Sequence, residues 1–186
     1  MLVKGNWQGI WQPLQQQDEA GRFLRLTSDV RNWITPDGSP GRTGTEGFKA
    51  EAGRYLLYVA LICPWACRTL LVRKLKKLET QIEVAIVSPI LGDQGWEFAP
   101  FPASTKEPLY NYHYLHQLYT RHASDFTGRA TVPVLWDRHQ NCMVSNESAD
   151  ILRMLNSAFP TEGPDLYPSQ LQADINFWNQ QLYASL

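Results

Sequence analysis

The chain has 186 residues, of which 44% are hydrophobic and 12% aromatic. This composition is typical of a globular protein with one good-sized core, or with one domain and part of another, and it excludes a disordered chain. The 17 basic and 18 acidic residues are mixed along the sequence and give a formal net charge of -1. We therefore expect no nucleic-acid partner and no membrane partner. No apolar run is long enough for a signal peptide or a membrane span, so the expected location is cytoplasmic.

The cysteines Cys63, Cys67 and Cys142 do not form the even-numbered framework of a disulfide-rich secreted protein. Cys63 and Cys67 are four residues apart, one more than in the Cys-x-x-Cys redox motif. We predict that Cys67 packs inside a helix, with a resolving or regulatory thiol as the alternative. The four histidines show no Cys/His ligand spacing, so no metal site is expected.

Residues 1–53 show little periodicity but carry several large apolar side chains, so they are predicted to form an N-terminal arm packed on the main domain. Residues 22–26 are compatible with a short edge strand, and residues 33–41 indicate turns. Three glycines are spaced G-x-x-G-x-x-G without a strand before them or an apolar helix after them, which predicts a loop and not a phosphate site. These glycines are Gly41, Gly44 and Gly47, and the large apolar residues are Trp7, Trp11, Phe23, Trp33 and Phe48.

From Arg54 onward the hydrophobic pattern becomes regular and predicts alternating strands and helices, interrupted by a long loop at 88–108. The predicted strands are 55–62, 82–87, 132–136 and 142–145, and the predicted helices are 65–78, 109–122 and 147–156. Each parallel strand pair needs a helical crossover. This order therefore predicts an α/β fold, a small mixed sheet with helices on both faces.

Cys63 lies where the first predicted strand ends and the first helix begins. Pro64 suits the first helical position, because the first N–H groups of a helix have no intrahelical partner. Cys63 is therefore expected at or next to the N-cap, where these N–H groups and the helix dipole favour the thiolate, the nucleophilic form of cysteine. The alternative is a small buried cysteine that simply ends a strand.

Four sequence motifs extend this pattern. They are Cys63-Pro64-Trp65-Ala66, Gly95-Trp96-Glu97-Phe98, the segment from Thr127 to Asp137, and Asn146-Glu147-Ser148. In this order they resemble the glutathionyl-hydroquinone reductases, the Xi class of glutathione transferases, and residues 31–35 of the arm resemble that family too. The resemblance implies a thioredoxin-like N-terminal domain at 54–158, followed at 159–186 by a linker and the first helix of an all-α C-terminal domain.

The resemblance also implies roles for individual residues. Cys63 would be the catalytic nucleophile. Val132 would precede a cis Pro133 and pair through its backbone with glutathione, as an added strand does. Glu147 and Ser148 open a helix whose N–H groups suit the γ-glutamyl carboxylate, and the Glu147 carboxylate would take the amino group of the same moiety.

Two more residues are expected at the glutathione site. Arg129 would pair with a glutathione carboxylate, and Trp96 would cover the peptide. Taken alone, these residues are equally compatible with a surface arginine and a core tryptophan. One position departs from the family pattern, since Cys67 stands where the family usually has histidine.

The reaction that the resemblance implies is removal of glutathione from glutathionyl-hydroquinones through a Cys63–glutathione mixed disulfide. Glutathione would be the co-substrate, small aromatic quinone-derived conjugates the substrates, and a homodimer is left open. Because family members carry further helices beyond the position of Leu186, with tyrosines that line the aromatic pocket, we expect poor turnover of hydroquinone conjugates. Two alternatives remain: a thiol transferase resembling glutaredoxins or cysteine-type dehydroascorbate reductases, and a non-catalytic glutathione-binding remnant.

Overall fold

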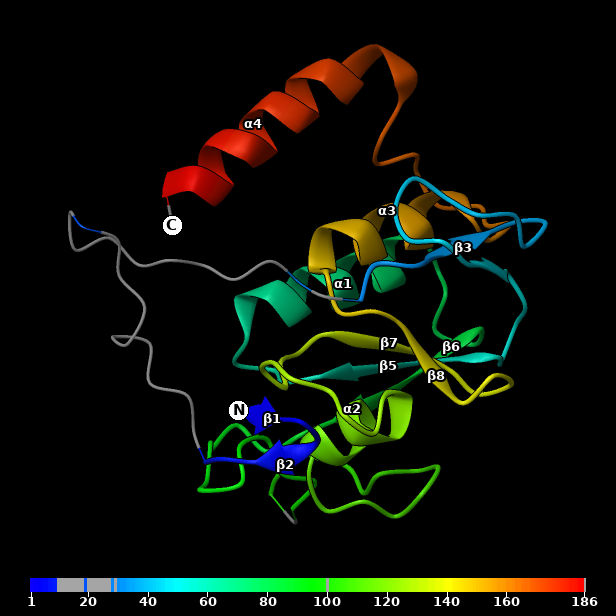
Figure 1. Ribbon diagram of the computed structural model, residues 1–186. Coiled ribbons are helices and arrows are strands. Elements are labelled where there is room, and N and C mark those ends of the chain that lie inside the picture. The colour runs from blue at the N-terminus through cyan, green and yellow to red at the C-terminus, as the bar shows by residue number, and fades with distance from the viewer. Residues whose placement is uncertain (10–18, 20–27, 29, 100, 186) are drawn as a thin grey trace.

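The computed structural model describes residues 1–9, 19, 28, 30–99 and 101–185 (Figure 1). Its centre is a four-stranded sheet with the strand order β6-β5-β7-β8. The strands are β5 (Tyr55–Val59), β6 (Ile82–Ile86), β7 (Val134–Asp137) and β8 (Cys142–Ser145). β5 is parallel to β6 and antiparallel to β7, and β7 is antiparallel to β8. The predicted mixed sheet is confirmed.

Helices cover both faces of this sheet. Figure 1 shows α1 (Pro64–Leu75) and α3 (Ser148–Ser157) on one face and α2 (His116–His122) on the other. α1 and α3 pack against each other, while α2 packs against β8. In α3, the buried residues Ile151, Met154 and Leu155 recur at helical spacing, so the helix turns one apolar side toward the core.

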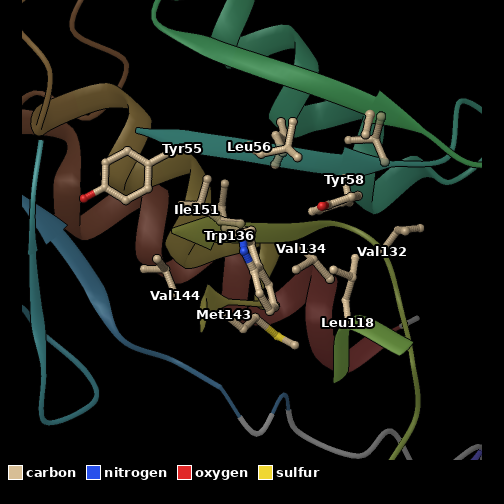
Figure 2. Close-up of a cluster of buried hydrophobic side chains, with 14 of the residues drawn as sticks. Tyr55, Leu56, Tyr58, Leu118, Val132, Val134, Trp136, Met143, Val144 and Ile151 are labelled. Atoms are coloured by element: carbon tan, nitrogen blue, oxygen red, sulfur yellow. The ribbon is translucent and has the colours of Figure 1, made fainter. Parts of the chain in front are cut away.

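The two central strands account for much of the core. All five residues of β5 and all four of β7 are buried, as expected for strands covered on both faces. Figure 2 shows the Trp136 indole with Met143 and Leu118 on the same side of β7. The Trp136 indole N–H donates to the Tyr110 hydroxyl at 3.2 Å, so the largest buried side chain keeps its polar atom paired.

Residues near the N-terminus form two small strand pairs, β1 (Leu2–Val3) with β2 (Asn6–Trp7), and β3 (Trp33–Thr35) with β4 (Gly47–Lys49). The prediction of turns throughout residues 33–41 was wrong for β3. Trp33 and Ile34 are buried and pair with β4, a contact that local turn chemistry does not reveal. The edge strand predicted at 22–26 lies outside the described residues, and the domain boundaries at 53/54 and 158/159 stay predictions.

Two predicted ends near the first helix are also corrected. The first strand ends at Val59 and not at Ile62, because the chain turns outward there and leaves Ile62 exposed. α1 ends at Leu75, because Lys77 adopts a left-handed φ of 53°. The N–H of Lys77 bonds to the Lys74 carbonyl oxygen and that of Leu78 to the Arg73 carbonyl oxygen, the Schellman pattern of a helix C-terminus.

The second helix begins later than its apolar pattern predicts, at His116 and not at residue 109. The buried Glu107 carboxylate accepts the backbone N–H groups of Leu109 and Tyr110, at 3.1 and 2.6 Å. Asn111 then has a left-handed φ of 56°. A side-chain acceptor thus competes for the N–H groups near residue 109, and the chain stays irregular up to α2.

The C-terminal part holds a 3-10 turn at Ser169–Leu171 and α4 (Gln172–Ser185). Figure 1 shows α4 beyond α3, away from the sheet. Its large apolar residues Phe177 and Trp178 are exposed. Within the described part of the chain, no helix combines the length and apolar character needed to cross a membrane.

A buried ion pair ties the start of β5 to the end of β7. Asp137 is fully buried, and its carboxylate accepts the Arg54 Nε–H at 2.9 Å and the His139 backbone N–H at 2.7 Å. The hydrogen bond to Asp137 raises the pKa of the Arg54 guanidinium above its ordinary value. The pair therefore fixes two central strands around a carboxylate that has no access to water.

Replacing Arg54 with methionine should lower the free energy of unfolding by about 3–5 kcal/mol, because it leaves the Asp137 charge buried without a counter-ion. Urea unfolding followed by circular dichroism measures this. The matched control is Lys74→Met, which removes an exposed ion pair with Glu79 and should leave the midpoint nearly unchanged. Equal midpoints for Arg54→Met and wild type would contradict the role of the pair.

The half-buried His122 should make the free energy of unfolding depend on pH. Its Nδ1 accepts the Met143 backbone N–H at 3.2 Å, which requires an unprotonated nitrogen, and burial lowers its pKa below the ordinary value. The unfolded chain then binds the proton more readily, so this contribution to stability is present above about pH 6.5 and is lost as the pH falls through the folded-state pKa.

We expect the free energy of unfolding to decrease between about pH 7.5 and about pH 5.5, and to decrease less in His122→Gln, whose amide oxygen still accepts the Met143 N–H. Urea titrations at several pH values test this. Superimposable profiles for the variant and wild type would show that His122 does not contribute.

Candidate active site

Cys63 lies at the junction of β5 and α1. The Cys63 N–H donates to the Ala60 carbonyl oxygen at 3.0 Å, which closes the turn that follows β5. Cys63 is the N-cap of α1, with an extended backbone (φ -87°, ψ 116°), and Pro64 is the first helical residue. Its side chain makes no capping hydrogen bond and is half-buried. The sulfur therefore lies at the positive end of the α1 dipole, as the sequence predicted.

The segment before β7 forms the second side of the site. The Val132–Pro133 peptide bond is cis, as the resemblance implied. The Cys63 Sγ lies 3.7 Å from the Val132 carbonyl oxygen, so the two predicted residues are brought together. The described residues provide no acceptor for the Val132 backbone N–H. A backbone donor of the kind that pairs with an extended peptide thus lies beside the sulfur.

The third side is the N-terminus of α3. Glu147 is the N-cap, and its carboxylate accepts the Ala149 N–H at 3.0 Å and the Ser28 hydroxyl at 2.9 Å. Ser148 follows as the first helical residue and is buried. For its backbone N–H, no acceptor is found in the part of the chain that the structure describes. Glu147 thus caps the helix, and the Ser148 N–H belongs to the first turn of α3, where helix N–H groups and the helix dipole favour an anion.

Arg68 connects this helix N-terminus to α1, and no sequence motif indicated this role. Its Nε and Nη2 donate to the Ser148 Oγ at 3.1 and 2.6 Å, and Nη2 lies 3.8 Å from the Glu147 Oε1. In the sequence, Arg68 is only one of several basic residues between the leucines of α1. Its partner lies 80 positions further along the chain, so no local pattern could have identified it.

Trp96 and Arg129 line one cavity of about 160 Å³. Thr131, which directly precedes the cis segment, lines it too, so the cavity adjoins the site around Cys63. Met1 and Trp7 form part of the same wall. No local pattern predicts this contribution, because the N-terminal segment is held beside residues 128–131 by the pairing of Leu2 with the distant Gly128.

The other two cysteines lie in different surroundings. Cys67 is exposed, so the prediction that it packs inside the helix was wrong. It shares the outer face of α1 with Leu71 and Leu75, which follow at a spacing of four and are also exposed. Cys142, at the start of β8, is half-buried, and burial together with the nearby Asp137 carboxylate raises the pKa of its thiol to about 11.

These surroundings predict the order in which the thiols react. With limiting iodoacetamide at about pH 7.5, Cys63 should react fastest because its sulfur lies at the positive end of the α1 dipole, the exposed Cys67 should follow, and Cys142 should be slowest because its raised pKa leaves little thiolate. Peptide mass mapping over time gives the three rates. A rate at Cys63 no greater than that at Cys67 would rule out activation by the helix N-terminus.

The sheet order, the cysteine N-cap and the cis segment define a thioredoxin-like domain of the kind that opens glutathione transferases. A family model described as "Glutathione S-transferase, N-terminal domain" matches residues 62–158. The chain therefore belongs to the glutathione S-transferase family. The predicted fold class, a thioredoxin-like glutathione transferase domain followed by a short helical part, is confirmed.

Individual relatives show which group within this family the chain resembles. The chain is 47% identical to the glutathionyl-hydroquinone reductase YqjG of Escherichia coli K12 over 98% of its own length and 56% of the relative's. It is 36% identical to the glutathionyl-hydroquinone reductase PcpF of Sphingobium chlorophenolicum, over 100% of this chain and 56% of PcpF. The predicted resemblance to this group is confirmed, and the chain spans little more than half of these relatives.

Solved structures agree. The glutathione-bound structure of Escherichia coli YqjG matches with a TM-score of 0.85 and 44% identity, covering 98% of this chain and 54% of that one. The Xi glutathione transferase of Phanerochaete chrysosporium matches with a TM-score of 0.79 and 46% identity, covering 87% and 54%.

Proposed function

We propose that this chain binds glutathione and acts as a glutathione-dependent thiol transferase that removes glutathione from glutathionyl-hydroquinones. The observation that carries this proposal is the position of the Cys63 sulfur, at the N-terminus of α1 and 3.7 Å from the Val132 carbonyl oxygen. The reductase names of YqjG and PcpF, and the structure of YqjG with glutathione bound, support the substrate class.

In this proposal glutathione lies extended along the segment before β7. Its cysteinyl part pairs with the backbone of Val132, beside Pro133, which brings the glutathione sulfur to Cys63. Its γ-glutamyl end meets Glu147 and Ser148 at the start of α3. In this arrangement the Cys63 sulfur and the N-terminus of α3 contact two parts of the same bound peptide.

The opposite end of the peptide reaches the cavity lined by Trp96 and Arg129. Arg129 pairs there with the second glutathione carboxylate, and Trp96 covers the peptide. An arginine suits this task, because its guanidinium can donate two parallel hydrogen bonds to a carboxylate.

The reaction then has two displacement steps. The Cys63 thiolate attacks the sulfur of the glutathionyl-hydroquinone, the carbon–sulfur bond breaks, and the hydroquinone carbon takes up a proton. Cys63 is left as a mixed disulfide with glutathione. A second glutathione, as thiolate, attacks the glutathione sulfur of that disulfide, releases oxidised glutathione and regenerates the Cys63 thiolate. The aromatic ring is thereby reduced, and the thioether sulfur of the conjugate and one glutathione thiol become one disulfide.

We place this chemistry in the cytoplasm, where the glutathione pool keeps exposed thiols reduced. Three free cysteines, one of them exposed, suit such a compartment.

Incubation with oxidised glutathione should give a glutathione adduct on Cys63, detected by intact-protein and peptide mass spectrometry. The Cys63→Ser variant should lose the fast adduct, while Cys67→Ser, which removes the neighbouring exposed thiol, should keep it. An adduct that forms only on Cys67, or forms equally fast in Cys63→Ser, would contradict the proposed nucleophile.

A turnover assay distinguishes the proposed reductase activity from that of a general thiol transferase. With a glutathionyl-hydroquinone and excess glutathione, the proposal expects release of hydroquinone and oxidised glutathione in equal amounts. Rapid reduction of a small glutathione mixed disulfide with no release of hydroquinone from the conjugate would instead favour the general transferase, whose chemistry needs only the residues between Cys63 and Ser148.

A further inference from the structure

The Arg68 side chain lies between the N-termini of α1 and α3, and its hydrogen bonds to Ser148 do not stabilise its own helix. It follows the nucleophile on α1, but its Nε and Nη2 both donate to the Ser148 Oγ on α3, at 3.1 and 2.6 Å. The guanidinium carbon lies over the Trp65 ring, 4.8 Å from its centre, in a cation–π contact. The side chain is thus held in place from α1 while its hydrogen bonds reach α3.

These hydrogen bonds decide what the Ser148 hydroxyl can do. A guanidinium has only donors, so the Ser148 Oγ must be the acceptor in both contacts. The hydroxyl proton is then directed elsewhere, and the described residues provide no acceptor for it. Ser148 therefore presents two donors in the same place, its O–H and its backbone N–H, at the positive end of α3.

The charged groups around the first turn of α3 match one kind of ligand. The Arg68 Nη2 lies 3.8 Å from the Glu147 Oε1, so a cation and an anion flank the first turn of α3. The Glu147 carboxylate already accepts the Ala149 N–H and the Ser28 hydroxyl but has lone pairs left for another donor. A pair of donors beside an acceptor matches an α-amino acid in its charged form, with a carboxylate next to an ammonium group.

We propose that Arg68 is a positioning residue that holds the Ser148 hydroxyl as a donor to the free α-carboxylate of the γ-glutamyl group, and so makes the chain selective for peptides that carry that carboxylate. This inference rests on the proposed binding of glutathione. It adds a determinant outside the motifs that the sequence analysis singled out, and it assigns the selectivity to one hydrogen-bonded contact between α1 and α3.

The test compares two ligands that differ only in that carboxylate. S-methylglutathione cannot form a disulfide, and S-methyl-γ-aminobutyryl-cysteinylglycine lacks the α-carboxylate but is otherwise the same. Isothermal titration calorimetry should show that wild type binds S-methylglutathione more tightly. Arg68→Met should weaken binding of S-methylglutathione by about tenfold or more, and binding of the decarboxylated peptide by less than about threefold.

Two further variants separate positioning from packing. In the Ser148→Ala background, Arg68→Met should weaken S-methylglutathione binding much less than it does in wild type, because the hydroxyl it orients is gone. Arg73→Met is the matched control: it removes another guanidinium of α1, which donates to the Ile82 and Glu79 carbonyl oxygens, and it should leave the ratio of the two affinities unchanged.

Each outcome has a defined meaning. If Arg68→Met reduced the affinity for both ligands by the same factor, the inference would be overturned and Arg68 would be a packing residue. The same conclusion would follow if Arg68→Met reduced the affinity for S-methylglutathione equally with and without the Ser148 hydroxyl. Binding of both ligands by wild type with equal affinity would also overturn it, while leaving the proposed function intact. If wild type binds neither ligand, the proposed function itself fails, and the inference fails with it.

Discussion

The structure depends on how β5 ends. Five buried residues hold this strand at the centre of the sheet, and the chain then turns and starts a helix at a proline. Because the core fixes the strand and the proline fixes the helix start, the residue between them has little freedom of position. That residue is Cys63, and its sulfur lies at the N-terminus of α1, the positive end of the helix dipole. A flexible loop could not hold a nucleophile in this way.

A second helix N-terminus shares the site, and parts of the chain far apart in sequence hold it there. Arg68 reaches from α1 to the first turn of α3. From the N-terminal part, Ser28 donates to the Glu147 carboxylate, and the Arg31 guanidinium lies 2.7 Å from the Asp150 carboxylate. The N-terminal residues described thus do more than cover the core, because they fix the helix that faces the proposed γ-glutamyl group.

Sequence patterns predicted the features that neighbouring residues form and missed the contacts between residues far apart in the chain. The strand, cysteine, proline and helix follow one another directly, so their arrangement and the N-cap position of Cys63 could be predicted from patterns of a few residues. The β3 and β4 pairing and the contact of Arg68 with Ser148 join residues that no periodicity relates. The late start of α2 has the same kind of cause, since one buried carboxylate, Glu107, captures N–H groups that the apolar pattern assigns to a helix. Cys67 was misassigned because helical spacing places a residue on a face but does not say what covers that face.

The central claim is that glutathione binds in extended form between Cys63 and the start of α3. Amide hydrogen exchange, measured residue by residue by NMR with and without S-methylglutathione, tests it most directly. The account predicts that the ligand slows exchange at the Val132 and Ser148 amides, whose N–H groups have no acceptor among the described residues, and leaves the amides of α2 unchanged. Binding that leaves both amides unprotected, or protects α2 instead, would contradict it.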